Sequence, residues 1–317
     1  MTSIITSPAD FNVGDLYVDL RGAFGRSLFL KCEGFNFAGS IKLKAALEMV
    51  EVQERLGALA PGGTVVESSS GNMGVALSVV AAARGYRFVC VTDVRSTAAA
   101  RRVMAAYGAE VHVVDEPDEA GGYLGTRLAR VRRLCREHPD YVWLNQYANP
   151  GNWGGHYRTT GPEIAKAFPE LDVLFVGAGT TGTLMGCARY FREHHPSVRV
   201  VAIDSVGSVT FGMPPGRRMI PGLGSSVRPA ILDESWVDEV LHVPEVDAVR
   251  ACRAMLRKGF LFGGSTGTAV AGALTWLDRA GAGDDLTAVT ISPDLGNHYL
   301  DTVYDEQWGR EVFDLDG

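Results

Sequence analysis

Short apolar runs rich in β-branched residues alternate with longer amphipathic stretches along most of the chain. The runs predict strands at Thr64–Glu67, Arg87–Thr92, Glu110–Val114, Tyr141–Leu144, Leu171–Val176, Val198–Ile203 and Leu286–Ser292. The stretches between them have apolar residues at helical spacing and predict helices such as Asn72–Arg84, Thr97–Tyr107, Glu119–Glu137 and Gly182–His194. Several runs are mostly apolar, which is typical of strands covered on both faces. The pattern therefore predicts an α/β fold with mostly parallel sheets flanked by helices.

Another helical pattern begins at Lys42. Its apolar positions recur every three or four residues, at Ile41, Ala45, Ala46, Met49 and Val50. Ser40 stands where an N-cap residue is expected. Partial burial and the positive end of the helix dipole would both favour the neutral amine of Lys42. Since a neutral amine condenses with aldehydes, Lys42 is a candidate Schiff-base residue; a solvated lysine in a first helical turn is the alternative.

The composition is that of a globular protein with a sizeable core. Of the 317 residues, 46% are hydrophobic and 21% are charged, and the net charge is −7. Basic residues are scattered, which argues against a nucleic-acid partner or a membrane surface. The five cysteines have no metal-type spacing, and the N-terminus lacks a signal-peptide pattern. We therefore expect buried free thiols, no metal site and a cytoplasmic location.

The length and the pattern indicate two lobes. We expect a smaller lobe at 42–145 and a larger lobe formed by 1–41 and 146–317. The segment Val206–Pro229 is rich in proline, glycine and serine. Because it lies inside the second half of the α/β pattern, an ordered active-site loop or interface segment is at least as well supported as a linker.

Three loops that open helical patterns combine glycine with hydroxyl groups. They are Glu67–Gly74, Val176–Thr183 and Gly263–Gly267. In the first two, backbone N–H groups at a helix start, together with serine and threonine hydroxyls, can bind a phosphate or a carboxylate. Ordinary capping of the helix is the alternative for the first loop and the usual role of a hydroxyl at the position of the third.

The second of these loops also contains the bare pattern Gly-x-Gly-x-x-Gly, at Gly177, Gly179 and Gly182. In a dinucleotide-binding fold this pattern follows an early strand, and an acidic residue lies near the end of the next one. Here the pattern lies past the middle of the chain, and Asp204 is only close to the acidic position. The threonines of the loop favour a phosphate cup, and an NAD-dependent enzyme is the alternative.

In this order along the chain, the lysine segment and the three loops resemble the fold-type II pyridoxal-phosphate family that contains cysteine synthase and cystathionine β-synthase. The resemblance covers nearly the whole chain. It implies that Lys42 forms the Schiff base, in a segment similar to Asn-Pro-x-x-Ser-x-Lys with Phe37 in place of the proline. The cofactor, pyridoxal 5'-phosphate, would also be bound by Asn72, Gly179, Thr180, Thr181, Gly182, Thr183 and Ser265. Thr181 stands where the family usually has glycine.

The resemblance also implies a reaction type. Ser69, Ser70, Gly71 and Gln146 match residues that bind the carboxylate of the amino-acid substrate. Ser265 matches the residue that hydrogen-bonds the ring nitrogen of the cofactor. A neutral serine does not hold that nitrogen protonated, so the ring is a weaker electron sink, which suits expulsion of a β-substituent. The predicted reaction is β-replacement through an aminoacrylate, with Lys42 as the base for the α-proton.

Several segments differ in sequence from cysteine synthase, and all of them resemble one other branch of the family. They are Lys42-Leu-Lys44, Ser68–Met73, Asn145–Thr160, Ile220–Ser226 and Ser292–Asn297. They resemble the branch that makes N-(2-amino-2-carboxyethyl)-L-glutamate, the precursor of 2,3-diaminopropionate in siderophore and peptide-antibiotic pathways. The resemblance implies O-phospho-L-serine and L-glutamate as substrates, and a homodimer.

The sequence indicates the residues that select the substrates less clearly than the residues that bind the cofactor. Phosphate and a dicarboxylate both favour cations, and Arg218 is the candidate we select among Lys44, Arg158, Arg217 and Arg218. Tyr147 is a candidate for the wall of the second-substrate pocket. Each has an ordinary structural alternative, a solvated surface charge or a core aromatic. Two further functions stay open: cysteine synthesis with sulfide as the nucleophile, and a non-catalytic binding module of the same fold.

Overall fold

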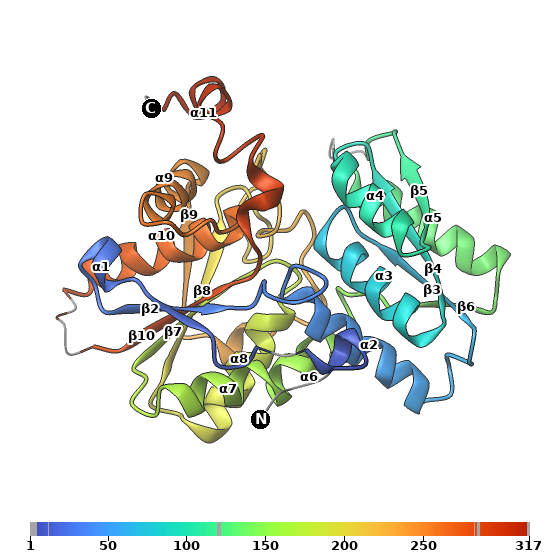
Figure 1. Ribbon diagram of the computed structural model, residues 1–317, viewed down its shortest axis with the longest axis horizontal. Coiled ribbons are helices and arrows are strands. Elements are labelled where there is room, and N and C mark those ends of the chain that lie inside the picture. Colours follow the sequence, from blue (N-terminus) through green and yellow to red (C-terminus); the bar gives the residue numbers. More distant parts are fainter. Residues whose placement is uncertain (1–4, 12, 119–121, 282, 284–285, 316–317) are drawn as a thin grey trace. The chain divides into compact units, whose positions relative to one another are not determined.

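The structure is a computed structural model that describes residues 5–11, 13–118, 122–281, 283 and 286–315 (Figure 1). It divides into two compact units. The first contains the described residues of 1–12 and 36–155, and the second those of 13–35 and 156–317. The lobe limits predicted from the sequence, at residues 42 and 145, differ from the limits of these units. The predicted domain boundaries therefore stay a prediction.

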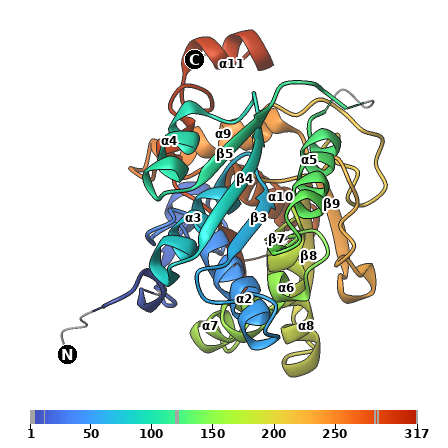
Figure 2. The same ribbon diagram turned by 90° about the vertical axis from the view of Figure 1, so that its right-hand side faces the viewer.

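The first unit is built on a sheet of four parallel strands in the order β5-β4-β3-β6. The strands are β3 (Thr64–Ser68), β4 (Arg87–Asp93), β5 (Glu110–Val114) and β6 (Tyr141–Trp143). Its helices are α2 (Lys42–Arg55), α3 (Asn72–Arg84), α4 (Ala98–Ala106) and α5 (Leu124–Glu137). Helix α3 lies on one face of the sheet and α5 on the other (Figure 2). Because side chains alternate along a strand, Val65 packs with α2 and α3, and Val66 packs with α5. Every residue of β3 is buried, so this strand has helices on both faces.

The second unit has a sheet of six strands in the order β1-β2-β10-β7-β8-β9. They are β1 (Tyr17–Asp19), β2 (Leu28–Cys32), β7 (Val173–Gly177), β8 (Arg199–Ser205), β9 (Glu239–Val243) and β10 (Ala288–Ser292). Only the edge strand β1 is antiparallel to its neighbour. Four of its helices are α7 (Thr160–Ala167), α8 (Gly182–His194), α9 (Glu245–Leu256) and α10 (Gly264–Arg279). The side chains of Trp276 and Leu277 on α10 join Phe175 and Val201 of the sheet in the main core of this unit.

The remaining elements are short. They are η1 (Pro8–Asp10), α1 (Arg21–Phe24), α6 (Pro150–Arg158), η2 (Glu234–Trp236), η3 (Gly296–Tyr299) and α11 (Glu306–Phe313). No helix in the described part of the chain has both the length and the apolar character needed to cross a membrane.

The predicted α/β fold is confirmed, and all seven predicted strands are present with ends shifted by at most two residues. The helices Asn72–Arg84 and Gly182–His194 have the predicted limits. The predicted helix Glu119–Glu137 starts outside the described residues, at 119–121, and its described part begins at Leu124. Strands β1, β2 and β9 were not predicted, because a charged or polar side chain interrupts each short apolar pattern.

The cysteines are free thiols, as predicted. Four are buried: Cys32, Cys90, Cys187 and Cys252. Burial raises the pKa of Cys32, Cys90 and Cys252 to about 12. The prediction of complete burial is wrong for Cys135, which is half-buried on α5.

The prediction that Ser40 caps helix α2 is also wrong. The N-cap position is Ile41, which has helical dihedrals (φ −55°, ψ −19°) and no capping hydrogen bond from its side chain. Instead, the Ser40 carbonyl oxygen accepts from Asn36 Nδ2 at 2.9 Å and from the Leu43 N–H at 3.3 Å. This turn leaves the Ser40 hydroxyl buried, with no hydrogen-bond partner among the described residues.

Strand β2 carries a fully buried lysine. Lys31 Nζ lies 2.8 Å from a carboxylate oxygen of Glu163 and 3.2 Å from one of Glu33, and it donates to the Gly14 carbonyl oxygen at 2.8 Å. Burial acts to lower the pKa of Lys31, but the two carboxylates outweigh it and the pKa is raised. The charged cluster therefore ties β2 to α7 inside the second unit.

Replacing Lys31 with methionine should lower the free energy of unfolding by about 3 kcal/mol, because two carboxylates lose their counter-charge inside the protein. Urea denaturation at neutral pH measures the loss. Lys258→Met is the matched control, since Lys258 is exposed and its replacement should change stability by less than about 0.5 kcal/mol. Equal stability of the two variants would show that the cluster does not hold β2 in place.

Candidate active site

Lys42 is the first residue of helix α2 and is half-buried. The turn before it is fixed by Asn36, whose Oδ1 accepts from the Ala38 N–H at 2.9 Å. Leu43, directly after the lysine, is buried in the core of the first unit. The lysine therefore stands at a rigid helix start, as the sequence predicts.

The loop between β3 and α3 is organised by Ser69. Its Oγ accepts from the N–H of Gly74 at 2.9 Å and of Gly71 at 3.2 Å. Gly74 has no room for a side chain, because a Cβ there would meet Met104 Sδ and Cys90 Sγ. Ser69 is buried, Ser70 is exposed, and Gly71 and Asn72 are half-buried. The hydroxyl of Ser69 thus holds the loop together, and Ser70–Asn72 are the loop residues open to a ligand.

Gln146 lies beside this loop. Its Nε2 donates to the Ser68 carbonyl oxygen at 2.9 Å, and its own carbonyl oxygen accepts from Asn152 Nδ2 at 2.6 Å. Asn145 before it has a left-handed backbone (φ 51°), a conformation that asparagine tolerates better than most residues. The segment is therefore held in one geometry next to the loop. Tyr147 follows it and is half-buried.

Glu67, in β3, joins the loop to the Gln146 segment. Its fully buried carboxylate accepts from the N–H of Ser68 at 2.8 Å and of Gln146 at 3.1 Å, and from Trp143 Nε1 at 3.4 Å. Burial raises the pKa of Glu67 to about 7, against the opposing effect of these donors and of the Arg127 charge. The sequence alone did not single out Glu67. Its role in joining the two segments depends on contacts with Trp143 and Gln146, which lie 76 and 79 residues further along the chain.

In the second unit, the predicted phosphate loop lies between β7 and α8. Thr181, the N-cap of α8, has a left-handed backbone (φ 67°), a conformation that glycine adopts without strain and that other residues rarely adopt. Gly179 cannot carry a side chain without strain, because a Cβ there would lie 2.9 Å from the Gly222 carbonyl oxygen. The loop is therefore fixed by close backbone packing.

The donors of this loop fit a phosphate group. The first N–H groups of α8 have no acceptor within the helix and lie at the positive end of its dipole. The hydroxyl of Thr181 is buried and has no hydrogen-bond partner in the part of the chain that the structure describes. Thr180 is buried and Thr183 is half-buried.

His156 contacts the same loop, although its sequence context gave no sign of this. Its Nε2 lies 3.2 Å from Thr183 Oγ1, and its Nδ1 lies 2.9 Å from Thr160 Oγ1. The ring is 1% exposed. The spacing of His156 and Thr160 on the helical pattern could have suggested their contact, but the contact with Thr183 spans 27 residues.

Ser265 is in the first turn of α10, and its hydroxyl donates to the Pro221 carbonyl oxygen at 3.4 Å. Tyr299 lies nearby and donates to Asp294 Oδ2 at 2.8 Å. Burial and the Asp294 charge raise the pKa of Tyr299 well above its ordinary value, so Tyr299 stays protonated. Gly222 packs so closely against Ser265 that a Cβ there would meet the serine hydroxyl.

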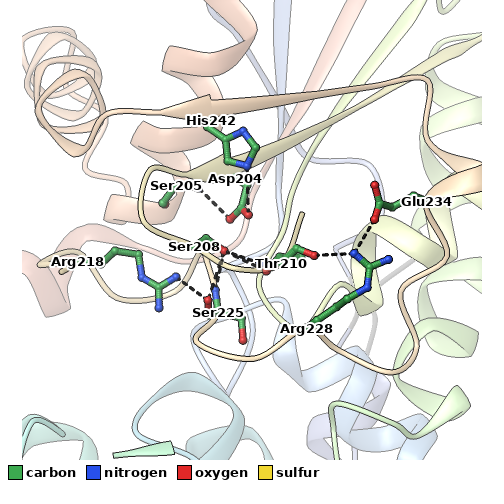
Figure 3. Close-up of polar contacts among 9 residues, drawn as sticks. All are labelled: Asp204, Ser205, Ser208, Thr210, Arg218, Ser225, Arg228, Glu234 and His242. Atoms are coloured by element: carbon green, nitrogen blue, oxygen red, sulfur yellow. Dashed lines mark hydrogen bonds and ion pairs between the residues drawn. The ribbon is translucent and has the colours of Figure 1, made fainter. Parts of the chain in front are cut away.

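The segment Val206–Pro229 starts beside a buried carboxylate (Figure 3). Asp204 Oδ1 accepts from the Ser205 N–H at 2.8 Å, and His242 Nε2 lies 4.0 Å from Asp204 Oδ2. Burial raises the pKa of Asp204, although hydrogen bonds from Ser208 and Ser205 and the charges of His242 and Arg218 oppose this. The carboxylate is thus inside the unit rather than at a dinucleotide site.

Ser208 is the centre of the hydrogen bonds that order this segment (Figure 3). Its Oγ accepts from the Ser225 N–H at 3.0 Å and lies 3.0 Å from Thr210 Oγ1. Arg218 Nη1 donates to the Ser225 carbonyl oxygen at 3.1 Å, and Arg228 Nη1 donates to the Thr210 carbonyl oxygen at 3.2 Å. The segment is therefore an ordered loop within the second unit. Arg218 braces it, in addition to any role towards substrate.

The far end of the same segment reaches the phosphate loop. The Gly224 N–H donates to the Ala178 carbonyl oxygen at 2.7 Å, and the Leu223 side chain leaves no room for a Cβ on Gly177. With the contact between Pro221 and Ser265, the second unit brings together Ser265, Pro221–Gly224 and Gly177–Thr183.

Comparison with known proteins identifies the family. A family model described as pyridoxal-phosphate dependent enzyme matches residues 17–294. The chain belongs to this family. It is therefore an enzyme whose cofactor is pyridoxal phosphate.

Two relatives indicate the branch. Both carry the name N-(2-amino-2-carboxyethyl)-L-glutamate synthase. The protein of Ralstonia nicotianae is 43% identical over 283 residues, which are 89% of this chain and 83% of that protein. The protein of Cupriavidus metallidurans is 43% identical over 297 residues, 92% of this chain and 87% of that protein.

Solved structures agree with the fold. The crystal structure of O-ureido-L-serine synthase superposes with a TM-score of 0.87 and 31% identity, covering 99% of this chain and 98% of that one. A lysine-to-alanine mutant of the same enzyme with O-ureido-L-serine bound gives the same TM-score and identity, over 99% and 96% of the two chains. The predicted family and fold are confirmed, and none of these similarities supports the NAD alternative.

The pKa of Glu67 predicts a pH-dependent stability. The folded protein keeps a proton at Glu67 up to about pH 7, whereas the unfolded chain releases it near 4.5. The wild type therefore loses stability relative to Glu67→Gln as the pH rises through this interval. We expect the advantage of Glu67→Gln in unfolding free energy to grow by about 2 kcal/mol between pH 5 and pH 8.

Urea denaturation at several pH values measures this difference. Glu116→Gln, at an exposed glutamate, is the control and should show no such trend. A difference between Glu67→Gln and the wild type that stays constant with pH would mean that Glu67 is ionised throughout.

Proposed function

We propose that the enzyme catalyses β-replacement of O-phospho-L-serine with L-glutamate, releasing phosphate and giving N-(2-amino-2-carboxyethyl)-L-glutamate. The observation that carries this proposal is the name shared by two relatives that are 43% identical over most of both chains. The product is a precursor of 2,3-diaminopropionate, so the pathway would be siderophore or peptide-antibiotic synthesis. We also infer a cytoplasmic homodimer from the family resemblance.

Lys42 is proposed as the residue that binds the cofactor aldehyde. When bound, pyridoxal phosphate supplies the electron sink that labilises the α-proton and the β-substituent of an amino acid. The amine of Lys42 would act as the base that takes the proton from the α-carbon of the substrate. Its place in the first turn of a helix packed in the core limits the positions that the amine can reach.

The remaining roles follow the chemistry of each loop. The exposed and half-buried residues Ser70, Gly71 and Asn72, with Gln146, are proposed to bind the substrate carboxylate and the cofactor ring hydroxyl. Ser69 would act by holding that loop. The residues Gly179–Thr183 are proposed to bind the cofactor phosphate, and Ser265 its ring nitrogen.

The second substrate asks for further cationic and polar groups. L-Glutamate carries two carboxylates, and the leaving phosphate is an anion, so each is bound best by arginine or by backbone N–H groups. Arg218 and Tyr147 are the residues that we propose for this task. Because Arg218 also donates a hydrogen bond to the Ser225 carbonyl oxygen, its replacement would affect both the order of the loop and substrate binding.

Changing Lys42 to alanine should abolish both product formation and the visible absorbance of the reconstituted protein, because the lysine–aldehyde linkage cannot form. Absorbance spectra recorded after incubation with pyridoxal phosphate and gel filtration measure the second effect. Lys258→Ala, at an exposed lysine, should keep the absorbance. A wild-type protein that remains colourless after this treatment would contradict the assignment of Lys42.

The substrates can be decided by a donor-by-nucleophile assay. O-phospho-L-serine and O-acetyl-L-serine are each incubated with L-glutamate or sulfide, and the products are resolved by mass spectrometry. We expect N-(2-amino-2-carboxyethyl)-L-glutamate from O-phospho-L-serine and L-glutamate, at a rate at least about tenfold above the other pairs, since a site that binds both carboxylates discriminates strongly against smaller nucleophiles. Formation of cysteine alone would replace the proposal by cysteine synthesis.

A further inference from the structure

Three side chains of the second unit form a hydrogen-bonded series that ends in the phosphate loop. Thr160 stands at the start of α7, His156 in α6 and Thr183 in the first turn of α8. The imidazole lies between the two hydroxyls, at 2.9 Å from Thr160 Oγ1 and 3.2 Å from Thr183 Oγ1. Thr160 and His156 are almost fully buried, whereas Thr183 is half-buried.

The hydrogens in this series are limited. A threonine hydroxyl has one hydrogen to donate, and a neutral imidazole has one N–H and one acceptor nitrogen. The oxygens of a phosphate dianion accept hydrogen bonds and donate none. Thr183 can therefore donate to a phosphate only if its hydroxyl hydrogen is not directed at His156.

Two arrangements of the neutral ring are possible, with opposite consequences. If the hydrogen is on Nδ1, the ring donates to Thr160 and Nε2 accepts from Thr183, which leaves only lone pairs of Thr183 for the phosphate. If the hydrogen is on Nε2, the ring donates to Thr183, and Nδ1 accepts from Thr160. The second arrangement leaves the hydroxyl hydrogen of Thr183 for the phosphate, with Thr160 as the donor to Nδ1.

We propose that His156 is a positioning residue for the cofactor phosphate: it donates from Nε2 to Thr183 and thereby directs the Thr183 hydroxyl hydrogen to the phosphate. Thr160 selects this arrangement by donating to Nδ1. The inference rests on the proposed role of Gly179–Thr183 in binding the phosphate. It adds a residue outside the loop that sets the donor direction within it.

The affinity of the cofactor-free protein for pyridoxal phosphate tests the proposal without relying on turnover. His156→Leu and His156→Asn remove a donor at the Nε2 position, and we expect each to weaken binding about tenfold, the loss of one charge-assisted hydrogen bond. Glutamine places its amide nitrogen close to the position of Nε2. His156→Gln should therefore stay within about threefold of the wild type, since most of that hydrogen bond is kept.

Pyridoxal, which lacks the phosphate, is the matched ligand. Its affinity should be the same for the wild type and for the three His156 variants, whereas general damage to the fold would weaken both ligands. In a Thr183→Val background, His156→Leu should have no further effect on pyridoxal phosphate binding, because the hydroxyl on which it acts is gone. Thermal denaturation of each variant confirms that it is folded.

The outcomes separate the two proposals. A wild-type protein that binds pyridoxal phosphate no better than pyridoxal would overturn the phosphate role of Gly179–Thr183. A wild type that prefers pyridoxal phosphate, together with a His156→Leu variant that keeps the same preference, would overturn the role of His156 alone. Nitrogen-15 NMR of the histidine rings gives an independent result: an Nε2-bound hydrogen on His156 supports the proposal, and an Nδ1-only ring contradicts it.

Discussion

The geometry of parallel strands is the constraint from which the proposed ligand-binding loop of each unit follows. Each strand of a parallel sheet ends at the same edge and is followed by a loop that opens a helix, so unpaired N–H groups collect there. In the first unit this edge carries Ser69–Asn72 after β3, and in the second it carries Gly179–Thr183 after β7. The anion binding that we propose for these loops is therefore a property of the backbone, and the side chains around each loop fix its shape.

Much of this arrangement could be predicted from the sequence because it is local. The loops, the helices after them and the lysine at the start of α2 are each encoded within a few neighbouring residues. Thr181 shows the limit of such reasoning: its place in the loop was predicted, but the left-handed backbone that replaces a glycine is visible only in the structure. Ser40 shows an error of the same kind, since Asn36 shapes the turn that keeps its hydroxyl from capping the helix.

The residues that sequence analysis missed are those that act over long separations. Glu67 depends on Gln146 and Trp143, and His156 depends on Thr183, contacts that no local pattern encodes. Strand β2 was not predicted because Lys31 interrupts its apolar run. A lysine can be buried there because Glu163, on another element, helps to neutralise its charge. The substrate-specific residues were the least predictable. Arg218, selected for its charge, is also part of the internal bracing of its own loop.

The buried cysteines have a practical meaning for work with this enzyme. A thiol with a raised pKa is almost entirely protonated at neutral pH, and a protonated thiol reacts slowly with alkylating and oxidising reagents. Cys32, Cys90, Cys187 and Cys252 are all withdrawn from solvent, and only Cys135, on α5, is partly accessible. Burial raises the pKa of Cys135 as well, so its partial access to solvent is what distinguishes it from the other four, and a maleimide dye or spin label should attach there first.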